Sequence, residues 1–583
     1  MTLRRLTKSA FALSLAMLLT ACPPPGGMPS ASPGPVATEA NRGNGAVSAA
    51  DPRAQAAGEE ILAKGGSATD AAIAVMLALT VVEPQSSGIG GGGFLVHAGE
   101  SGVTTFDGRE TAPAAATPNR FLDADGNRLP RETRVLSGLS VGVPGNVALA
   151  AKAHSQYGKL EWAELFKPAI RLASEGFRMN RRLNESLNRS KGRADKTEAA
   201  KGIFFGEDGE ALPVGAIVRN PDFARTLESL SAAGPRFMYF VMAERLAGYI
   251  AAETPQDGAM VTADIDAYAA KLRDPVCGRY RSYKICGMGP PSSGGVAVAQ
   301  MLGQLERFDI AAMGPDSATF WHLFLESQRI AYADRGLYIG DSDFVSVPVA
   351  GLVDPAYLAK RSALISPEKA LAAATPGKPE GADLALAAGD RPFEQGTTHF
   401  SVVDKDGNAV SYTSTIEGAF GSGLFFEGFY LNNELTDFSA TPQRDGKLVA
   451  NAVQGGKRPR SSMAPTIVFN DKGEVVLVIG AAGGPTIPVQ TARAIIGVVD
   501  FGMTAQEALG LPLIMAFGQT VVYEQGTMLD AMEEDLKALG HAQIRGFGAP
   551  LKANALRRVT GEDGTVTWEA ARDPRVEPKL VYE

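Results

Sequence analysis

The chain of 583 residues has an ordinary globular composition, with 45% hydrophobic and 21% charged residues. This is enough apolar material for one large core or two moderate ones. The formal net charge is −8, and the first 21 residues hold three basic residues and no acidic one, so their removal makes the remainder more acidic. An acidic surface argues against nucleic acid and against anionic lipid as partners.

The N-terminus has the pattern of an export signal. Three basic residues precede an apolar run at residues 10–19, which is too short to stay in a bilayer as a helix. Leu-Thr-Ala-Cys at residues 19–22 resembles a bacterial lipobox, so we expect residues 1–21 to be removed and Cys22 to be lipidated. A plain secretory signal with an incidental cysteine is the alternative. Residues 22–44, rich in Pro, Gly and Ala, would be a tether, and the protein would be periplasmic in either case, held at the membrane only by lipid.

A glycine-rich segment follows two predicted helices, the second of which, residues 67–82, is apolar almost all round and therefore buried. Gly88, Gly90 and Gly93 satisfy the GxGxxG pattern of dinucleotide-binding proteins. That pattern requires a strand before it and a helix after it. Here the helix precedes the glycines and a predicted strand at residues 94–97 follows them. We therefore interpret the glycines as points of close backbone packing.

A second motif, Gly-x-Ser-x-Gly at residues 138–142, is typical of serine hydrolases. A nucleophile elbow needs a helix directly after its serine, but Pro144 delays any helix here. None of the five histidines is marked as a partner for Ser140. We expect Ser140 to be structural, and residues 146–365 beyond it to be mainly helical.

Cys277 and Cys286 are the only cysteines beyond Cys22, and they flank a short predicted hairpin. The symmetry of that hairpin places them opposite each other. A disulfide is one interpretation in an oxidising periplasm; two free thiols packed as small apolar residues are the other. Neither indicates a metal site, because two cysteines without a nearby histidine are too few ligands.

The central feature of the sequence is a predicted β-hairpin whose loop is residues 404–408. Its Asp-Gly-Asn content suits a turn with positive φ, and β-branched and aromatic runs flank it. If Val403 faces Ala409 across the loop, counting outward places Thr397 opposite Thr415. Two hydroxyl groups would then meet at the open end of the hairpin.

The position of Thr397 predicts a cleavage site. Residues 372–394, rich in Ala, Gly and Pro, have no recognisable secondary structure and lead to Gly396 and a threonine that opens a buried strand. Cleavage between Gly396 and Thr397 would free a threonine α-amino group, the built-in base of an N-terminal threonine nucleophile. An ordinary hairpin within a sheet is the alternative interpretation.

This segment resembles the processing site of the γ-glutamyltranspeptidase (glutathione hydrolase) family of N-terminal nucleophile hydrolases. The resemblance extends from about residue 45 to the end of the chain. It implies an α+β fold, a four-layer αββα sandwich built as one domain from a large subunit of residues 45–396 and a small catalytic subunit of residues 397–583. It also implies a heterodimer of these two fragments that acts on the γ-glutamyl amide of glutathione and related small molecules.

Further motifs resemble the substrate site of that family. Arg109 opens the motif Arg-Glu-Thr-Ala-Pro and corresponds to an arginine that grips the substrate carboxylate, a role that suits a planar guanidinium. Ser461 and Ser462, within Arg-Ser-Ser-Met-Ala-Pro, correspond to a serine pair that binds the same substrate carboxylate. By the same resemblance, Glu434 and Asp437 would bind the substrate ammonium group.

The resemblance also implies a mechanism. Gly483 and Gly484, in Ala-Ala-Gly-Gly-Pro, would offer two backbone N–H groups to the oxyanion. The α-amine of Thr397 would take the proton of its own hydroxyl, attack would give a γ-glutamyl-enzyme, and water, an amino acid or a peptide would accept the group. Thr415 would hydrogen-bond the oxygen of the nucleophile. No metal and no organic cofactor is required.

Glu417 departs from the family pattern, because well-studied members have at this position an asparagine that contacts the ammonium. A carboxylate also accepts that hydrogen bond, but it adds a third negative charge around one cation, so the substrate preference stays open. Residues 439–456 are shorter than the full lid of the family and contain no tyrosine. This indicates an open lid and a bias to hydrolysis.

Two other functions are compatible with the sequence. A cephalosporin (glutaryl) acylase would share the fold, but glutaryl groups lack the amine that Glu434 and Asp437 are expected to hold. A non-enzymatic periplasmic lipoprotein that binds γ-glutamyl peptides is the alternative from another class. The intact pair of Thr397 and Thr415 argues against it.

Overall fold

A computed structural model describes residues 45–383, 385–389, 396–548 and 551–582. The chain divides into two units, residues 1–37 and 38–583, and all described residues belong to the second. The predicted signal, Cys22 and the tether lie outside the described residues. Within the described ranges no helix is both long enough and apolar enough to cross a bilayer.

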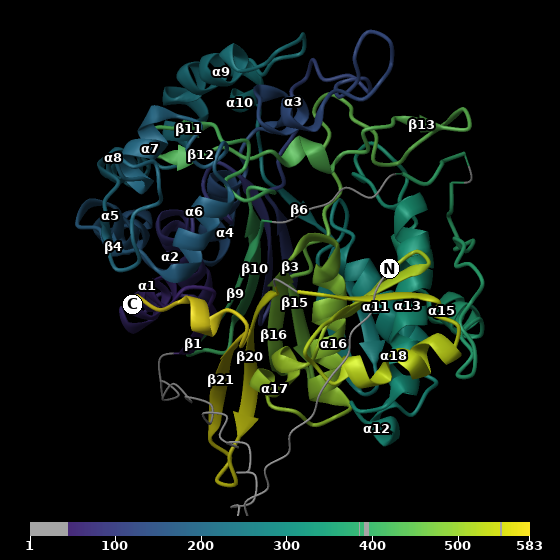
Figure 1. Ribbon diagram of the computed structural model, residues 1–583. Coiled ribbons are helices and arrows are strands. Elements are labelled where there is room, and N and C mark those ends of the chain that lie inside the picture. Colours follow the sequence, from purple (N-terminus) through teal and green to yellow (C-terminus); the bar gives the residue numbers. More distant parts are fainter. Residues whose placement is uncertain (1–44, 384, 390–395, 549–550, 583) are drawn as a thin grey trace, which may run out of the picture. The chain divides into compact units, whose positions relative to one another are not determined.

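Two six-stranded antiparallel sheets form the centre of this unit (Figure 1). The first sheet comprises, in spatial order, β1 (Gly45–Ala49), β9 (Thr398–Asp404), β10 (Ala409–Thr415), β2 (Gly92–Gly99), β3 (Gly102–Asp107) and β6 (Lys271–Arg273). The second comprises β21 (Val566–Arg572), β20 (Lys552–Thr560), β16 (Val475–Ala482), β15 (Thr466–Phe469), β8 (Tyr283–Gly287) and β7 (Val276–Tyr280).

The two sheets pack face to face, with β16 and β20 lying against β9. Side chains alternate across each strand, and the two hydrophobic cores follow that alternation. In β2, Phe94 and Val96 belong to the core between the sheets, whereas Leu95 belongs to the core under the first helical layer. Each sheet is therefore covered on both faces.

Helices cover the outer face of each sheet. On the first sheet lie α1 (Pro52–Ala63), α2 (Ala68–Val82) and α4 (Asn146–Tyr157); on the second lie α11 (Gly294–Leu305), α16 (Ile487–Val499) and α17 (Ala505–Gly510). The order of layers is helix, sheet, sheet, helix (Figure 1). The predicted α+β, four-layer αββα sandwich is confirmed.

The remaining elements extend these layers. The other helices are α3 (Arg131–Val135), α5 (Lys167–Ser174), α6 (Arg181–Arg189), α7 (Glu198–Phe204), α8 (Pro221–Ala233), α9 (Ala243–Ala252), α10 (Thr262–Asp266), α12 (Ile310–Met313), α13 (Ala318–Tyr338), α14 (Val349–Leu352), α15 (Pro355–Ser362) and α18 (Leu529–Ala538). The shorter strands are β4 (Phe177–Arg178), β5 (Ile217–Val218), β11 (Phe425–Phe426), β12 (Phe429–Tyr430), β13 (Gln443–Arg444), β14 (Lys447–Leu448), β17 (Ile514–Phe517), β18 (Thr520–Glu524) and β19 (Gln543–Phe547).

Helix α2 shows how local sequence and packing agree. Ser67 caps it, accepting a hydrogen bond from Asp70 N–H, while the Asp70 carboxylate accepts one from Ser67 N–H. This reciprocal capping box fixes where the helix begins. Every residue of α2 is buried, as its unbroken apolar composition predicts. The helix lies against β9 and β10 and supports the hairpin from behind.

Both predicted hairpins have the expected register. Val403 pairs with Ala409, and the ladder runs outward to Thr398 opposite Ser414, so Thr397 and Thr415 face each other as predicted. In the β7–β8 hairpin Cys277 pairs with Cys286, and the two form a disulfide.

The glycine run after α2 packs against the end of the hairpin. A methyl group added at Gly91 would be 2.0 Å from the carbonyl oxygen of Thr415, and one added at Gly90 would be 2.2 Å from that of Tyr430. Such contacts do not occur between real atoms, so these backbones approach closely only because both residues are glycine. The interpretation of the run as points of close backbone packing is confirmed.

We predict that Gly91→Ala disrupts the end of β10, because its methyl group must push away the Thr415 carbonyl. The protein should then lose stability and stay uncleaved at Thr397, which thermal denaturation and denaturing electrophoresis would detect. Gly248→Ala is the matched control: Gly248 is exposed in α9 with nothing near an added methyl, so it should gain about 0.5–1 kcal/mol. Equal behaviour of the two variants would contradict the prediction.

Candidate active site

Three oxygen atoms meet at the open end of the β9–β10 hairpin. The Thr415 hydroxyl donates to the carbonyl oxygen of Gly396 at 2.7 Å, and the Thr397 hydroxyl also donates to that carbonyl. The two hydroxyl oxygens are 3.3 Å apart, and both side chains are buried. The Thr397 hydroxyl therefore lies directly beside the Gly396–Thr397 peptide group, and the Thr415 hydroxyl is placed to polarise its carbonyl.

The backbone of Glu417 holds this arrangement from the other side. Its N–H donates to the Thr415 hydroxyl at 2.8 Å, and its carbonyl accepts from Gly396 N–H. Glu417 has φ of +72°, a left-handed conformation that is uncommon for a residue other than Gly, Asn or Asp. The chain turns sharply here, and the turn directs both backbone groups of one residue at the Gly396–Thr397 segment.

A polar layer between the two sheets fixes the position of the hairpin. His399 shares one hydrogen bond with Thr413 at 2.9 Å and another with Ser401 at 3.1 Å, and Ser401 donates in turn to the backbone of β16. Asn554 of β20 donates to the His399 carbonyl at 2.7 Å. Burial lowers the pKa of His399 to about 3, so the ring is neutral. This layer could not be predicted from the sequence, because its members alternate with apolar residues as in any buried strand.

Gly483 and Gly484 form a turn between β16 and α16, as predicted. Their φ values are +124° and +55°, which glycine adopts without steric cost. Gln490 donates to the Ala482 carbonyl at 2.8 Å, and Thr486 donates to the Gly483 carbonyl at 2.8 Å. These bonds hold the turn rigidly at the end of a strand in the sheet that packs on the hairpin.

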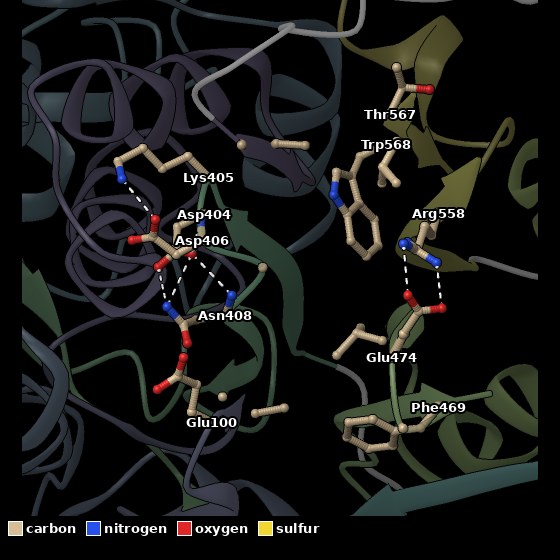
Figure 2. A pocket seen from close by; sticks show the side chains of 18 residues that line it. Glu100, Asp404, Lys405, Asp406, Asn408, Phe469, Glu474, Arg558, Thr567 and Trp568 are labelled. Atoms are coloured by element: carbon tan, nitrogen blue, oxygen red, sulfur yellow. Dashed lines mark hydrogen bonds and ion pairs between the residues drawn. The ribbon is translucent and has the colours of Figure 1, made fainter. Parts of the chain in front are cut away.

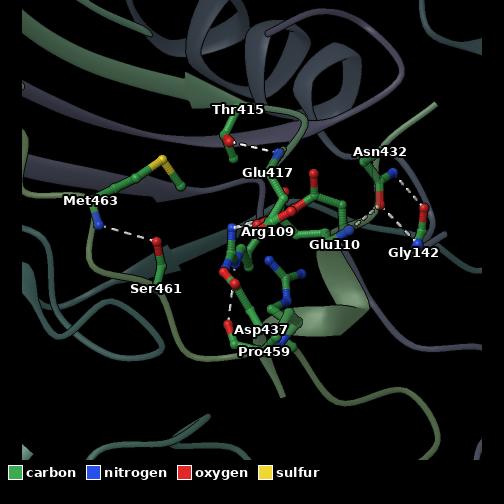
Figure 3. A network of polar contacts seen from close by, with 12 residues as sticks. Arg109, Glu110, Gly142, Thr415, Glu417, Asn432, Asp437, Pro459, Ser461 and Met463 are labelled. Carbon is green, nitrogen blue, oxygen red and sulfur yellow. Dashed lines mark hydrogen bonds and ion pairs between the residues drawn. The ribbon is translucent and has the colours of Figure 1, made fainter. Parts of the chain in front are cut away.

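Arg109 is the centre of a buried charge cluster (Figure 3). It follows directly on β3, and its guanidinium donates to Glu434 and, at 2.5 Å, to Asp437. These two acids lie three residues apart in a single turn of 3₁₀-helix, Glu434–Asp437, which places both side chains on one face. The sequence predicted separate roles for Arg109 and the two acids; the structure brings all three into direct contact.

Glu110 adds a third carboxylate that the sequence prediction did not assign. Its carboxylate is 3.9 Å from the Arg109 guanidinium and fully buried. Burial raises the pKa of Glu110 to about 7, although the charge of Arg109 opposes the shift. Burial likewise raises the pKa of Glu434 well above its usual range, and the charges of Glu110 and Glu417 add to the shift. The raised pKa values mean that protons offset part of the negative charge of three acids around one guanidinium. A cationic ligand group can take the place of those protons.

The two serines lie near this cluster on the strand-like segment before β15. Ser461 is held through its carbonyl, which accepts from the backbone and the hydroxyl of Ser293 at 2.8 and 2.7 Å. Arg335 of α13 donates to the Ser462 hydroxyl at 2.6 Å and to Ser293 at 2.7 Å. Arg335 therefore positions the serine pair, a role that the sequence prediction did not assign to it.

Asn432 ties the acidic turn to the glycine-rich segments. Its amide donates to the carbonyls of Gly90 and Gly142 at 2.8 and 2.9 Å, and its side-chain oxygen accepts from Gly142 N–H. The neighbouring Ser140 is buried and donates to the carbonyls of Val135 and Ser137. The serine of the apparent hydrolase motif is thus structural, as expected.

A cavity of about 580 Å³ lies elsewhere, between the hairpin loop and β20–β21. Figure 2 shows Asp404, Asp406 and Asn408 on one wall and Trp568 and Phe469 on the other. Because β9 separates its two ends by roughly 20 Å, this cavity is remote from Thr397. It takes no part in the candidate active site.

Among the described residues no group of three or more His, Cys, Asp or Glu side chains is arranged to hold a metal ion.

We predict that Glu110→Gln reduces the dependence of stability on pH. Folded Glu110 keeps its proton between its ordinary pKa of 4.5 and about 7, whereas the unfolded chain releases it. The free energy of unfolding therefore falls as pH rises through this window, by on the order of 3 kcal/mol. Thermal denaturation at pH 5 and pH 8 should show a smaller drop in Tm for the variant.

The exposed Glu207→Gln variant is the control and should keep the drop in Tm of the wild type. If Glu110→Gln and Glu207→Gln show the same pH dependence, the proposed titration of Glu110 is wrong.

Comparison with known proteins agrees with this geometry. The chain is 38% identical over 512 residues to a glutathione hydrolase proenzyme of Bacillus subtilis, covering 85% of each chain, and 39% identical over 481 residues to one of Escherichia coli, covering 80% of each. The crystal structure of a cephalosporin acylase from Bacillus halodurans matches with a TM-score of 0.81 and 26% identity, over 94% of this chain and 97% of the other. A sequence model described as Gamma-glutamyltranspeptidase matches residues 54–581, and the chain therefore belongs to the γ-glutamyltranspeptidase family.

Proposed function

We propose that the protein is an autoprocessed γ-glutamyl hydrolase and transferase that cleaves the γ-glutamyl amide of glutathione and related compounds. The observation that carries this proposal is the placement of the Thr397 and Thr415 hydroxyls on the Gly396 carbonyl. Its relatives in Bacillus subtilis and Escherichia coli are named glutathione hydrolase proenzymes, which supports both the activity and the processing.

Processing begins with the precursor. The Thr397 oxygen attacks the carbonyl carbon of Gly396 while the Thr415 hydroxyl stabilises the developing negative charge on the carbonyl oxygen. The hydroxyl proton passes to the Thr397 nitrogen as the peptide C–N bond breaks, and the acyl group moves from that nitrogen to the Thr397 oxygen. Water then hydrolyses the ester, which leaves a carboxylate on Gly396 and a free α-amine on Thr397. The fragments 45–396 and 397–583 stay together because strands of both form each sheet.

Turnover uses the same groups. The Thr397 amine takes the proton of the Thr397 hydroxyl, whose oxygen attacks the γ-carbonyl of the donor, and the backbone N–H groups of Gly483 and Gly484 bind the oxyanion. The leaving amine takes a proton and departs, so a γ-glutamyl ester remains on Thr397. Water or the amine of an amino acid or peptide then attacks this ester. Arg109, Ser461 and Ser462 bind the donor carboxylate, and no cofactor takes part.

The charge cluster favours γ-glutamyl over glutaryl donors. Glu110, Glu434 and Asp437 surround one guanidinium. The ammonium of a γ-glutamyl donor can interact favourably with these acids, whereas a glutaryl group has no amine to do so. The acylase neighbour shows that the fold also accommodates the alternative, but its identity of 26% is lower than that of the two glutathione hydrolase proenzymes. We therefore assign the γ-glutamyl activity first.

The location belongs to the same proposal. The signal at residues 1–21 and the cysteine of the lipobox-like motif support a periplasmic protein anchored through lipid on Cys22. Release of a Cys22→Ser variant from the membrane fraction would test it, and an unchanged distribution would refute the lipid anchor.

We predict that Thr397→Ala abolishes both processing and turnover, because it removes the attacking oxygen of both reactions. Purified wild-type protein should give two bands on denaturing electrophoresis, with the smaller fragment starting at Thr397 by N-terminal sequencing. The variant should give one band. Thr397→Ser, which keeps the oxygen, should still be cleaved. A wild-type protein that remains intact and inactive would support the non-enzymatic binding function instead.

We predict that kcat/KM for a γ-glutamyl anilide exceeds that for the matching glutaryl anilide by about 100-fold, because the hydrogen bonds from the ammonium to buried carboxylates are charge-assisted. Release of the aniline from each compound by the processed wild-type enzyme measures the ratio. Turnover of the glutaryl compound alone would show that the acylase alternative is correct.

A further inference from the structure

Arg193 lies beside the active site in the turn between α6 and α7. The turn is fixed at both ends: Arg193 N–H donates to the Ser190 carbonyl at 3.0 Å, and the Ala194 carbonyl accepts from the hydroxyl of Tyr430 at 2.5 Å. Tyr430 belongs to the fragment that follows Thr397. The turn therefore holds Arg193 against the catalytic fragment.

The guanidinium of Arg193 lies over Gly418. A methyl group added at Gly418 would be 2.7 Å from Nη1 and 3.1 Å from Nη2 of Arg193, so the guanidinium packs closely on the backbone of this glycine. A methyl group added at Gly396 would be 2.8 Å from the carbonyl carbon of Gly418 and 2.5 Å from the carbonyl oxygen of Glu417. Arg193 and the cleavage site thus contact the same short segment of backbone.

Arg193 is half-buried, and its partial burial is not explained by a direct partner. Within the described part of the chain its side chain makes no ion pair, and its Nε atom is buried without a hydrogen-bond partner. Burial lowers the pKa of Arg193, and the negative charge of Glu417 opposes that shift. Glu417 is therefore the principal counter-charge of Arg193, although the two act through space.

Glu417 links Arg193 to the substrate cluster. Its carboxylate accepts from the Asn433 amide, and the Asn433 side-chain oxygen accepts from Gly418 N–H at 2.9 Å. The charge of Glu417 also contributes to the raised pKa of Glu434, and Figure 3 shows Glu417 beside Arg109 and Glu110. The Glu417 carboxylate thus lies between two charged groups. Arg193, which packs on Gly418, is on one side, and the acids that surround Arg109 are on the other.

We propose that Arg193 is a positioning residue that compensates Glu417, and that the two form an electrically neutral pair which sets the preference for donors with an α-amino group. The inference rests on the proposed γ-glutamyl activity. With both charges present, the acids that contact Arg109 decide how strongly the donor ammonium binds. Loss of Glu417 alone would leave the charge of Arg193 to repel that ammonium across a poorly screened distance.

The test is a double-mutant cycle on the processed enzyme. Glu417→Asn suits the backbone, since Asn tolerates a φ of +72°. It should raise KM for a γ-glutamyl anilide about tenfold and leave kcat nearly unchanged, because it acts on binding of the ammonium. KM for the glutaryl anilide should not rise, since that compound carries no amine.

Adding Arg193→Gln to Glu417→Asn removes the positive charge that Glu417→Asn leaves without compensation, so KM for the γ-glutamyl anilide should return to within about twofold of the wild type. Arg189→Gln in the same background is the matched control, because Arg189 is an exposed arginine just before the same turn, and it should restore nothing. Arg193→Lys alone keeps the charge and should behave as the wild type.

Complete cleavage into two fragments and an unchanged Tm show that each variant is folded. Glu417→Gln, which removes the charge but keeps the length, replaces Glu417→Asn in the cycle if the latter is poorly processed. If the wild type is active on the γ-glutamyl anilide but the double variant has the same KM as Glu417→Asn, the pairing of Arg193 with Glu417 is refuted and the proposed function is not. A wild type that acts on glutaryl but not on γ-glutamyl anilide refutes the proposed function and the pair with it.

Discussion

The molecule depends on one hydrogen bond, from the Thr415 hydroxyl to the Gly396 carbonyl across the open end of the β9–β10 hairpin. A shift of register by a single residue would turn every side chain of β9 to the other face of the sheet, and Thr397 would lose both its partner and its target. Apolar packing alone specifies such a register weakly. The polar layer around His399 specifies it strongly, because each of its buried groups would be left unsatisfied after a shift.

The charge cluster at Arg109 has a different purpose from the polar layer. A buried arginine with several buried acids gains little net stability, because desolvation of the charges offsets much of their attraction. Its members come from a loop after β3 and from the Glu434–Asp437 turn, so they line the candidate active site and are not part of the hydrophobic core. The excess of acids over arginine is costly in the folded protein, and it becomes an advantage on binding if a substrate ammonium occupies the site, as in the function that we propose.

Sequence reasoning succeeded where the determining interactions are local. The hairpin register follows from the Asp-Gly-Asn loop next to the turn, and α2 follows from the Ser67 cap and an apolar run. It was less detailed where a proline intervenes. Within the region 146–365, expected to be mainly helical, a 3₁₀ turn precedes α5, which has Pro168 in its first turn.

Interactions between distant segments were the least predictable. Arg109 and Glu434 could be assigned to the substrate site only by resemblance, and nothing in the sequence indicated that they contact each other. Arg193 lies in a polar turn between two helices and looks like any solvated charge until the fold places it over Gly418. Residues whose partners are more than a hundred positions away leave no periodic pattern, and so their roles become visible only in three dimensions.

Glu417 shows how processing and substrate binding are separated within one residue. Its backbone N–H and carbonyl contact Thr415 and Gly396, and any residue that adopts its positive φ provides these contacts. Its side chain points instead into the charge cluster, where its identity matters only for the ligand. The position is therefore constrained in conformation but free in charge, provided that a neighbouring cation compensates. Arg193 is placed to do this from a different part of the chain, which accounts for a carboxylate at this position beside the three other buried acids of the cluster.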